Sequence, residues 1–306
     1  GGGIDEWTAG YLFNGANSWV RLPSTDVNTA TNVATFTNNS ASNLEAIYAI
    51  GHETELDAIR EYWSRGSGLY ADTTNWSTVC WTCPGHLNPA TDAPFSPDPD
   101  VTTTGGAATV HINVGHVIDV DQDNTEAFNV ELLGTLDVGN FVGMRGRQYY
   151  GDGRVIMRPD GVNANLPVGD WSQFVADGGT HEFAGTVDAY DLPTTPQIAE
   201  FWNVDITGTV RKVVTDDNIR VLNNLTIDGG ELDINDLRIR VGGDVTLTSG
   251  TIDAGIGELE LDGAADQIMT GDFITAASAN LYDLDLNKTG GNVLINVQST
   301  NQISAI

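Results

Sequence analysis

Apolar and polar residues alternate in short runs through residues 224–263, and the runs repeat. Written as two lines of twenty, the segment reads NLTIDGGELDINDLRIRVGG and then DVTLTSGTIDAGIGELELDG. Thr226 falls on Thr246, and Gly230 falls on Gly250. The apolar positions coincide as well: Leu225 with Val245, Ile227 with Leu247, Leu232 with Ile252, Ile239 with Leu259, and Val241 with Leu261. Self-similarity at a fixed period of about 20 residues indicates a repeat architecture.

Each line holds three runs with a period of two, the pattern of strands with one buried face. In the first line they are 224–228, 231–234 and 237–241, separated by polar or glycine-containing turns. Three strands and three turns in about 20 residues describe one triangular turn of a β-solenoid; the Leu/Asn signature of leucine-rich repeats is absent. Stacked turns pair in parallel about 4.8 Å apart, so each covers its neighbour's open edge.

The period predicts side-chain neighbours on consecutive turns. Arg238 and Arg240 are expected to point outward beside Glu258 and Glu260, respectively. Such exposed pairs contribute about 0.2–1 kcal/mol each, so they set the register more than they stabilise the fold.

A longer period is also expected. Residues 201–206 resemble residues 281–286, an offset of four turns of twenty, which predicts a four-turn super-repeat.

Alternation begins near residue 107 and continues to the end of the sequence. We therefore expect an all-β fold in which residues 101–306 form a right-handed parallel β-solenoid of roughly eight to ten turns, continuing beyond this segment. We expect residues 1–58 to form the end of a β-sandwich-like module and a linker. Within this stretch and just after it, the pattern of residues 53–63 fits a helix and an extended linker equally well. Residues 59–100, rich in Trp and Cys, are the expected cap.

Aromatic and cysteine residues cluster in the expected cap. Trp63, Trp76 and Trp81 could form a platform that stacks on sugars or a hydrophobic cover for the first turn, and the cover is favoured. Cys80 and Cys83 allow a redox pair, a zinc site with His86, or a short structural disulfide, which is the leading interpretation.

Charge limits the classes of partner. The net charge is −29, with only 13 Lys and Arg residues, which argues against nucleic acid and anionic membranes. An acidic coat that keeps the chain in solution is favoured over a surface that collects divalent cations. No run of 18 apolar residues occurs, so no membrane span is expected.

Carboxylates supply the candidate metal ligands. Asp119, Asp121 and Asp123 form D-x-D-x-D, a weak candidate for Ca²⁺ ligation that lacks the usual loop glycine and the twelfth-position glutamate. Asp233 and Asp253 should stack on adjacent turns, either splaying into water or bridged by an ion. No G-x-S-x-G turn or other nucleophile–base constellation occurs, so we expect no enzymatic activity.

Several motifs resemble a module of giant cell-surface proteins of Bacteroidota. They are YWSRGSG at 62–68, NWS at 75–77, Gly85-His86, a Pro-rich run, VHINVGHV at 110–117, LNNLTI at 222–227 and DVTLTSGT at 244–251; WVRLP at 19–23 through YAI at 48–50 resembles the β-rich module that often precedes it. The resemblance implies an adhesin or surface filament exported by type IX secretion.

The expected function is mechanical. We expect an extracellular, cell-surface segment that acts as a stiff spacer in attachment, gliding or capture of prey and surfaces. Its expected partners are flanking modules of the same polypeptide, copies of itself in a homo-oligomeric fibre, and surface glycans. A β-helical module that binds or cleaves carbohydrate is the alternative, because parallel β-helices also host polysaccharide lyases and hydrolases, although fold alone does not give function.

Overall fold

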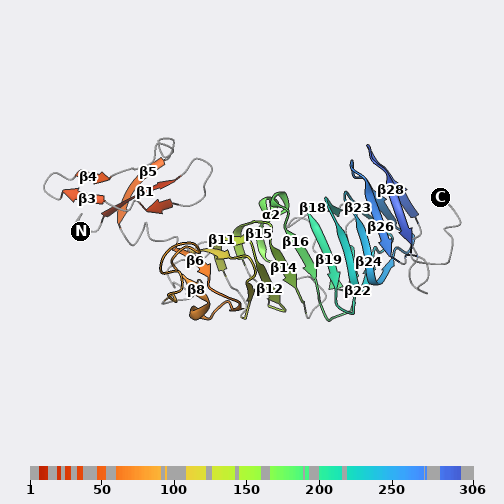
Figure 1. Cartoon of the computed structure of the whole chain (residues 1–306), viewed down its shortest axis with the longest axis horizontal. Helices are drawn as coiled ribbons and strands as arrows, with labels where there is room; N and C mark the ends of the chain where they lie inside the picture. Colours follow the sequence, from red (N-terminus) through yellow and green to blue (C-terminus); the bar gives the residue numbers. More distant parts are fainter. Residues whose placement is uncertain are drawn as a thin grey trace.

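The computed structural model describes residues 7–12, 19–21, 25–28, 33–36, 47–52, 60–90, 94, 108–121, 126–141, 145–159, 166–188, 190–192, 200–215, 219–271, 273 and 283–297. The chain is nearly all β, and its parallel sheets form a β-solenoid of about seven turns with about 20 residues each. The strands from β6 to β28 follow one another along the long axis (Figure 1). The predicted fold class is confirmed, but the solenoid has about seven turns instead of the expected eight to ten.

The longest sheet has twelve strands and runs through the whole stack. Its members are β7 (Gly68–Leu69), β10 (Val117–Asp119), β12 (Thr135–Gly139), β14 (Arg154–Met157), β16 (Thr180–Phe183), β17 (Tyr190–Asp191), β19 (Asn203–Thr207), β20 (Arg211–Val213), β22 (Leu225–Asp233), β24 (Val245–Asp253), β26 (Gln267–Gly271) and β28 (Val293–Val297).

Two further sheets form other sides of the solenoid, one in each half. The first is six-stranded and contains β6 (Arg60–Ser64), β8 (Trp76–Ser77), β9 (Ala108–Ile112), β11 (Glu126–Leu132), β13 (Arg145–Tyr150) and β15 (Val168–Asp170). The second is five-stranded and contains β18 (Glu200–Phe201), β21 (Arg220–Val221), β23 (Arg238–Val241), β25 (Glu258–Leu261) and β27 (Asp283–Leu286).

The alternating apolar residues of the repeat line the interior. Leu225, Ile227 and Leu232 are each 0 % exposed, and their partners one turn later are buried too. The first two predicted runs form one bent strand, β22, because Gly229 and Gly230 take positive φ angles of +113° and +65°. Any side chain at Gly230 would bring its Cβ within 2.4 Å of a backbone oxygen of the preceding turn, so this corner requires glycine.

The predicted register between turns is confirmed: Arg238 pairs with Glu258, and Arg240 pairs with Glu260. The side chains depart from the prediction, because the ion pair runs diagonally from Arg238 Nη1 to Glu260 Oε2, at 3.3 Å. Glu260 is only 3 % exposed instead of pointing into solvent. Asn287 donates a hydrogen bond to its Oε1 at 2.8 Å, which satisfies the buried carboxylate further.

The predicted four-turn super-repeat is wrong. Phe201 stacks in sequence on Val221, Val241, Leu261 and Leu286, so its equivalent is not residue 281. The step from 261 to 286 is longer than twenty residues, which shifts the frame of the last turn. In addition, residues 201–206 belong to two different sheets, because β18 ends at Phe201 and β19 begins at Asn203.

The length of a turn varies along the stack. In the longest sheet, successive inward residues lie at 118 and 136, at 155 and 181, and at 225 and 245. The long step from 155 to 181 contains the helix α2 (Ser172–Asp177), which ends at Gly178 with φ +102°. The largest insertion is therefore accommodated between strands, whereas bulges place single extra residues within β12 and β13.

The described N-terminal residues form antiparallel strands, and their assignment to a sandwich-like module stays a prediction. β1 (Trp7–Leu12) pairs with β2 (Trp19–Arg21) and with β5 (Ile47–His52), and β3 (Thr25–Asn28) pairs with β4 (Val33–Phe36). Of the helix candidate 53–63, residues 53–59 lie outside the described residues. Its end is not helical, because β6 pairs in parallel with β9.

The segment expected to be a cap also contributes strands to the stack. β6 and β7 pair in parallel with β9 and β10. β8 follows the short 3₁₀ helix η3 (Thr73–Asn75) and pairs antiparallel with β6. Trp76 on β8 is 0 % exposed and donates from Nε1 to the Tyr70 backbone oxygen at 2.7 Å. This tryptophan covers the end of the core, as predicted. Within the described part of the chain, no helix is long and apolar enough to cross a membrane.

Candidate functional site

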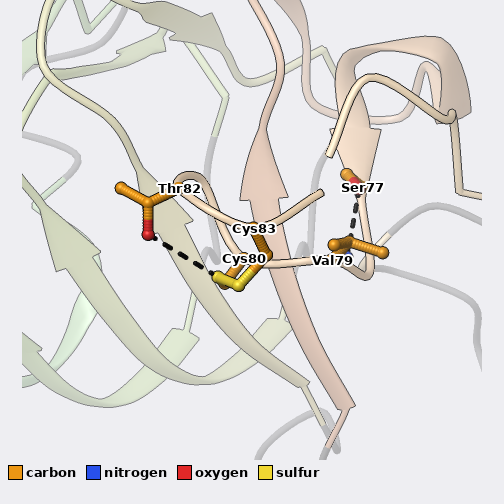
Figure 2. The surroundings of a disulfide bond; sticks show 5 residues. All are labelled: Ser77, Val79, Cys80, Thr82 and Cys83. Atoms are coloured by element: carbon orange, nitrogen blue, oxygen red, sulfur yellow. Dashed lines mark hydrogen bonds between the residues drawn. A yellow bond between two sulfur atoms is a disulfide. The ribbon is translucent and has the colours of Figure 1, made fainter. Parts of the chain in front are cut away.

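The disulfide loop projects from the first turn. Cys80 and Cys83 are joined by a disulfide with their Cα atoms 5.1 Å apart, and the Cys83 backbone nitrogen donates to the Cys80 oxygen at 2.9 Å. Figure 2 shows the loop, in which the Val79 nitrogen donates to Ser77 Oγ at 3.1 Å. Of the three interpretations of the C-x-x-C, the structure contains the disulfide.

Reducing this disulfide should have a small effect on stability, because the closed loop is short and lies at the surface. The chain-entropy relation gives no more than about 2 kcal/mol for so short a loop. Thermal unfolding with and without a phosphine reductant, and of Cys80→Ser with Cys83→Ser, measures the effect. Loss of cooperative unfolding on reduction would show that the loop is essential to the first turn.

Trp81 lies inside the disulfide loop and is 42 % exposed. Its ring meets the imidazoles of His86 and His116 edge to face, with centroids 4.5 and 4.9 Å apart. His116 Nδ1 lies 2.7 Å from Ser64 Oγ. Burial lowers the pKa of His116, and the nearby His86 lowers it further, while the hydrogen bond to Ser64 acts in the opposite direction.

Trp63 differs from the other two tryptophans, because it stacks on the outer face of the six-stranded sheet. Its ring is parallel to that of His111, with centroids 4.7 Å apart, and His111 Nδ1 lies 2.5 Å from Glu131 Oε2. Trp63, Trp76 and Trp81 therefore occupy three different environments. The structure does not bring them together into one platform, and only Trp76 has the predicted role of a buried cover.

The candidate calcium ligands are placed only in part. Asp119 is exposed at the end of β10, and Asp121 Oδ1 accepts a hydrogen bond from the Ala71 nitrogen at 3.1 Å. Asp123 lies outside the described residues. Among the residues that the structure describes, no group of three His, Cys, Asp or Glu side chains is arranged to hold a metal ion.

Asp233 and Asp253 do stack on adjacent turns. Their carboxylates bind different partners: Asp233 Oδ2 accepts from Arg211 Nη1 at 3.2 Å, and Asp253 Oδ1 accepts from the Gly255 nitrogen at 3.0 Å. The repulsion between like charges is thus offset by an arginine and by a turn hydrogen bond.

An open groove of about 560 Å³ lies along the corner of the solenoid that contains Gly208, Gly229 and Gly230, here called the glycine corner. Its lining comes from four successive turns: the segment after β16, the corner between β19 and β20, the bend of β22, and the bend of β24. The residues are Asp188, Gly208, Thr209, Arg211, Gly229, Gly230, Glu231 and Thr251. We take this concave polar surface as the candidate site.

Arg211 is the centre of the groove's polar network. Its Nη1 binds Asp233, its Nε lies 4.0 Å from Glu231 Oε1, and its backbone nitrogen donates to Asp188 Oδ1 at 3.3 Å. Thr251 Oγ1 donates to Glu231 Oε2 at 3.4 Å. Burial raises the pKa of Glu231, the charges of Asp253 and Asp233 raise it further, and Arg211 opposes them.

Lys212 supports the groove from inside the solenoid. It follows Arg211 on β20, and because neighbouring strand residues face opposite sides, its side chain enters the core, where it is 0 % exposed. Its Nζ donates to the backbone oxygens of Thr207 at 2.5 Å and Val210 at 2.8 Å. Burial lowers the pKa of Lys212 to about 8. The amine thereby fixes the corner between β19 and β20 that forms one wall of the groove.

The sequence carries a signal for this groove in the spacing of three polar residues. Arg211, Glu231 and Thr251 are spaced by twenty residues, and the structure pairs them on consecutive turns. Extending the repeat frame one turn toward the N-terminus would have placed these three polar side chains in one column at the glycine corner. Asp188 offered no comparable signal, since it lies outside that spacing.

Comparisons of the chain with protein-family models, with curated proteins and with solved structures found no match.

Proposed function

We propose that this chain is a structural segment of a large extracellular bacterial surface filament and acts as a stiff spacer. One observation carries the proposal: strands of the longest sheet pair in parallel from β7 through β28. A rod built this way resists bending, because each turn is bonded to both neighbours along several sheets. Such a segment would hold adhesive parts of the same polypeptide away from the cell during attachment, gliding or capture.

One other feature supports an extracellular location. The disulfide between Cys80 and Cys83 is of a kind that persists in oxidising compartments. The net charge of −29 disfavours contact with anionic membranes, which suits a segment held away from the cell. The stiffness of the rod is supported by ion pairs between turns. For example, Arg154 Nη1 lies 2.6 Å from both Glu182 and Asp205, which belong to the following turns.

Electron microscopy of the producing cells tests the proposal. Gold-labelled antibodies against residues 224–263 should decorate thin surface filaments at a constant distance from the cell envelope. Label confined to compact particles dispersed in the medium would contradict the proposal and favour a carbohydrate-active module. Release of new reducing ends from a polysaccharide panel by the purified chain would likewise favour cleavage.

A further inference from the structure

We propose that the groove at the glycine corner, defined by Thr209, Arg211, Glu231, Thr251 and Asp188, binds a linear glycan without acidic groups. The inference goes beyond a spacer role, because it gives this face of the solenoid a ligand of its own. It rests on the chemistry of the lining, the charge of the groove and its direction along the stack.

The lining is suited to hydroxyl groups. Glu231 and Asp188 present carboxylate oxygens that accept hydrogen bonds, the Arg211 guanidinium donates, and the hydroxyls of Thr209 and Thr251 do both. None of the lining residues is aromatic or aliphatic, whereas sites for apolar small molecules are lined mostly by such side chains. A ligand rich in hydroxyls offers donors and acceptors to both kinds of group.

Charge excludes an anionic ligand. The Arg211 guanidinium, 40 % exposed, is already compensated by Asp233 at 3.2 Å and Glu231 at 4.0 Å. Asp188 adds a further carboxylate, so the groove is net negative. A phosphate, sulfate or uronic acid would be repelled there, and the acidic chain as a whole reinforces that repulsion.

The direction of the groove favours a polymer over a single sugar. Its walls come from four consecutive turns, and three steps of about 4.8 Å between them span roughly 14 Å. The polar residues Arg211, Glu231 and Thr251 repeat once per turn along this line. A periodic row of hydrogen-bonding groups matches a chain with a periodic row of hydroxyls.

The corner glycines do not carry the proposal by themselves. Gly229 and Gly230 are needed for the bend of β22, since a Cβ on either would lie 2.3 or 2.4 Å from a backbone oxygen of the preceding turn. The open space beside these glycines therefore follows from the need for the bend, and is not by itself evidence of a ligand. The column of charged and hydroxyl side chains beside that space is what points to a ligand.

Isothermal titration calorimetry on the full 306-residue chain tests the inference. The probes are the neutral hexasaccharides cellohexaose, xylohexaose and mannohexaose, with hexagalacturonate as the anionic counterpart. Thr209→Phe fills the groove from an exposed position, and Thr251→Val removes one hydroxyl without changing volume. Thr289→Phe, on an exposed turn away from the groove, is the matched control.

Binding of at least one neutral hexasaccharide should be weakened at least tenfold by Thr209→Phe, weakened to a smaller extent by Thr251→Val, and unchanged by Thr289→Phe. The inference is overturned if none of the neutral probes binds, if hexagalacturonate binds more tightly, or if Thr209→Phe with an unchanged melting temperature binds like the wild type. None of these outcomes depends on whether filaments are seen on cells, so the two proposals can fail separately.

Discussion

Replacing His181 by leucine should stabilise the protein, and the gain should grow as the pH falls. His181 on β16 is 0 % exposed, and both of its ring nitrogens lack a hydrogen-bond partner. The rings of Trp171, Phe174 and Phe201 surround it at centroid distances of 5.3, 5.2 and 5.0 Å. Leucine has a similar volume and leaves no buried polar atom unsatisfied, which should contribute about 1–3 kcal/mol at neutral pH.

The pH dependence follows from the pKa of the imidazole. Burial lowers the pKa of His181 from 6.5 to about 3. Below pH 6.5 the unfolded chain binds a proton that the folded chain does not, so wild-type stability falls by about 1.4 kcal/mol per pH unit until the pH nears 3. Between pH 8 and pH 5 this group alone should remove about 2 kcal/mol.

Urea unfolding of the wild type and of His181→Leu between pH 8 and pH 4.5 measures the difference in free energy of unfolding. Carboxylates destabilise both proteins equally at low pH, so only the difference between them reports on His181. Val155→Leu, beside His181 in register, controls for a change in packing and should keep the wild-type slope. A difference that stays constant with pH would show that the native state accepts the proton.

Replacing Trp76 by alanine should destabilise the first turns by about 3–5 kcal/mol, the usual range for a large buried aromatic. The indole is 0 % exposed, meets the Tyr70 ring edge to face at 5.4 Å, and donates to the Tyr70 oxygen. Its loss leaves a cavity and an unpaired carbonyl at the end of the stack. Since each turn contacts only its neighbours, the damage should remain local.

Hydrogen exchange locates the damage predicted for Trp76→Ala. Protection should fall in β6, β7 and β9, whereas β22–β25 should keep theirs. Trp81→Ala is the matched control, because that ring is 42 % exposed and its loss should change the free energy of unfolding by about 1 kcal/mol or less. Equal effects of the two substitutions would show that Trp76 does not serve as the cover of the core.

The sequence predicted the interior of the solenoid well where the period is strict. Between Leu225 and Leu261 the alternation alone identifies the inward residues and the register, because a shift by one residue would turn every apolar side chain outward. The super-repeat failed because the step from 261 to 286 is longer than twenty residues. Similarity between two stretches of sequence does not show how many extra residues lie in the corners between them.

The candidate site was harder to predict than the fold. A groove forms where corners without side chains lie next to suitable residues of neighbouring turns. The number of residues between such positions varies from turn to turn, so the sequence does not show which of them meet. Glu260 shows the same difficulty, since its position in an alternating run predicts exposure while the residues of neighbouring turns, Arg238 and Asn287, cover it. Outward side chains are set by neighbours that local patterns do not specify.

The strict twenty-residue period of residues 224–263 has a consequence for how such a chain can evolve. The segments 224–243 and 244–263 follow one another without a gap, and their strands pair residue for residue apart from the bend. Unequal crossing-over within the gene at this point would insert or delete one whole segment. The product would keep its ends, its interior and its pairing partners, so selection could adjust the reach of the protein by recombination alone, without new substitutions.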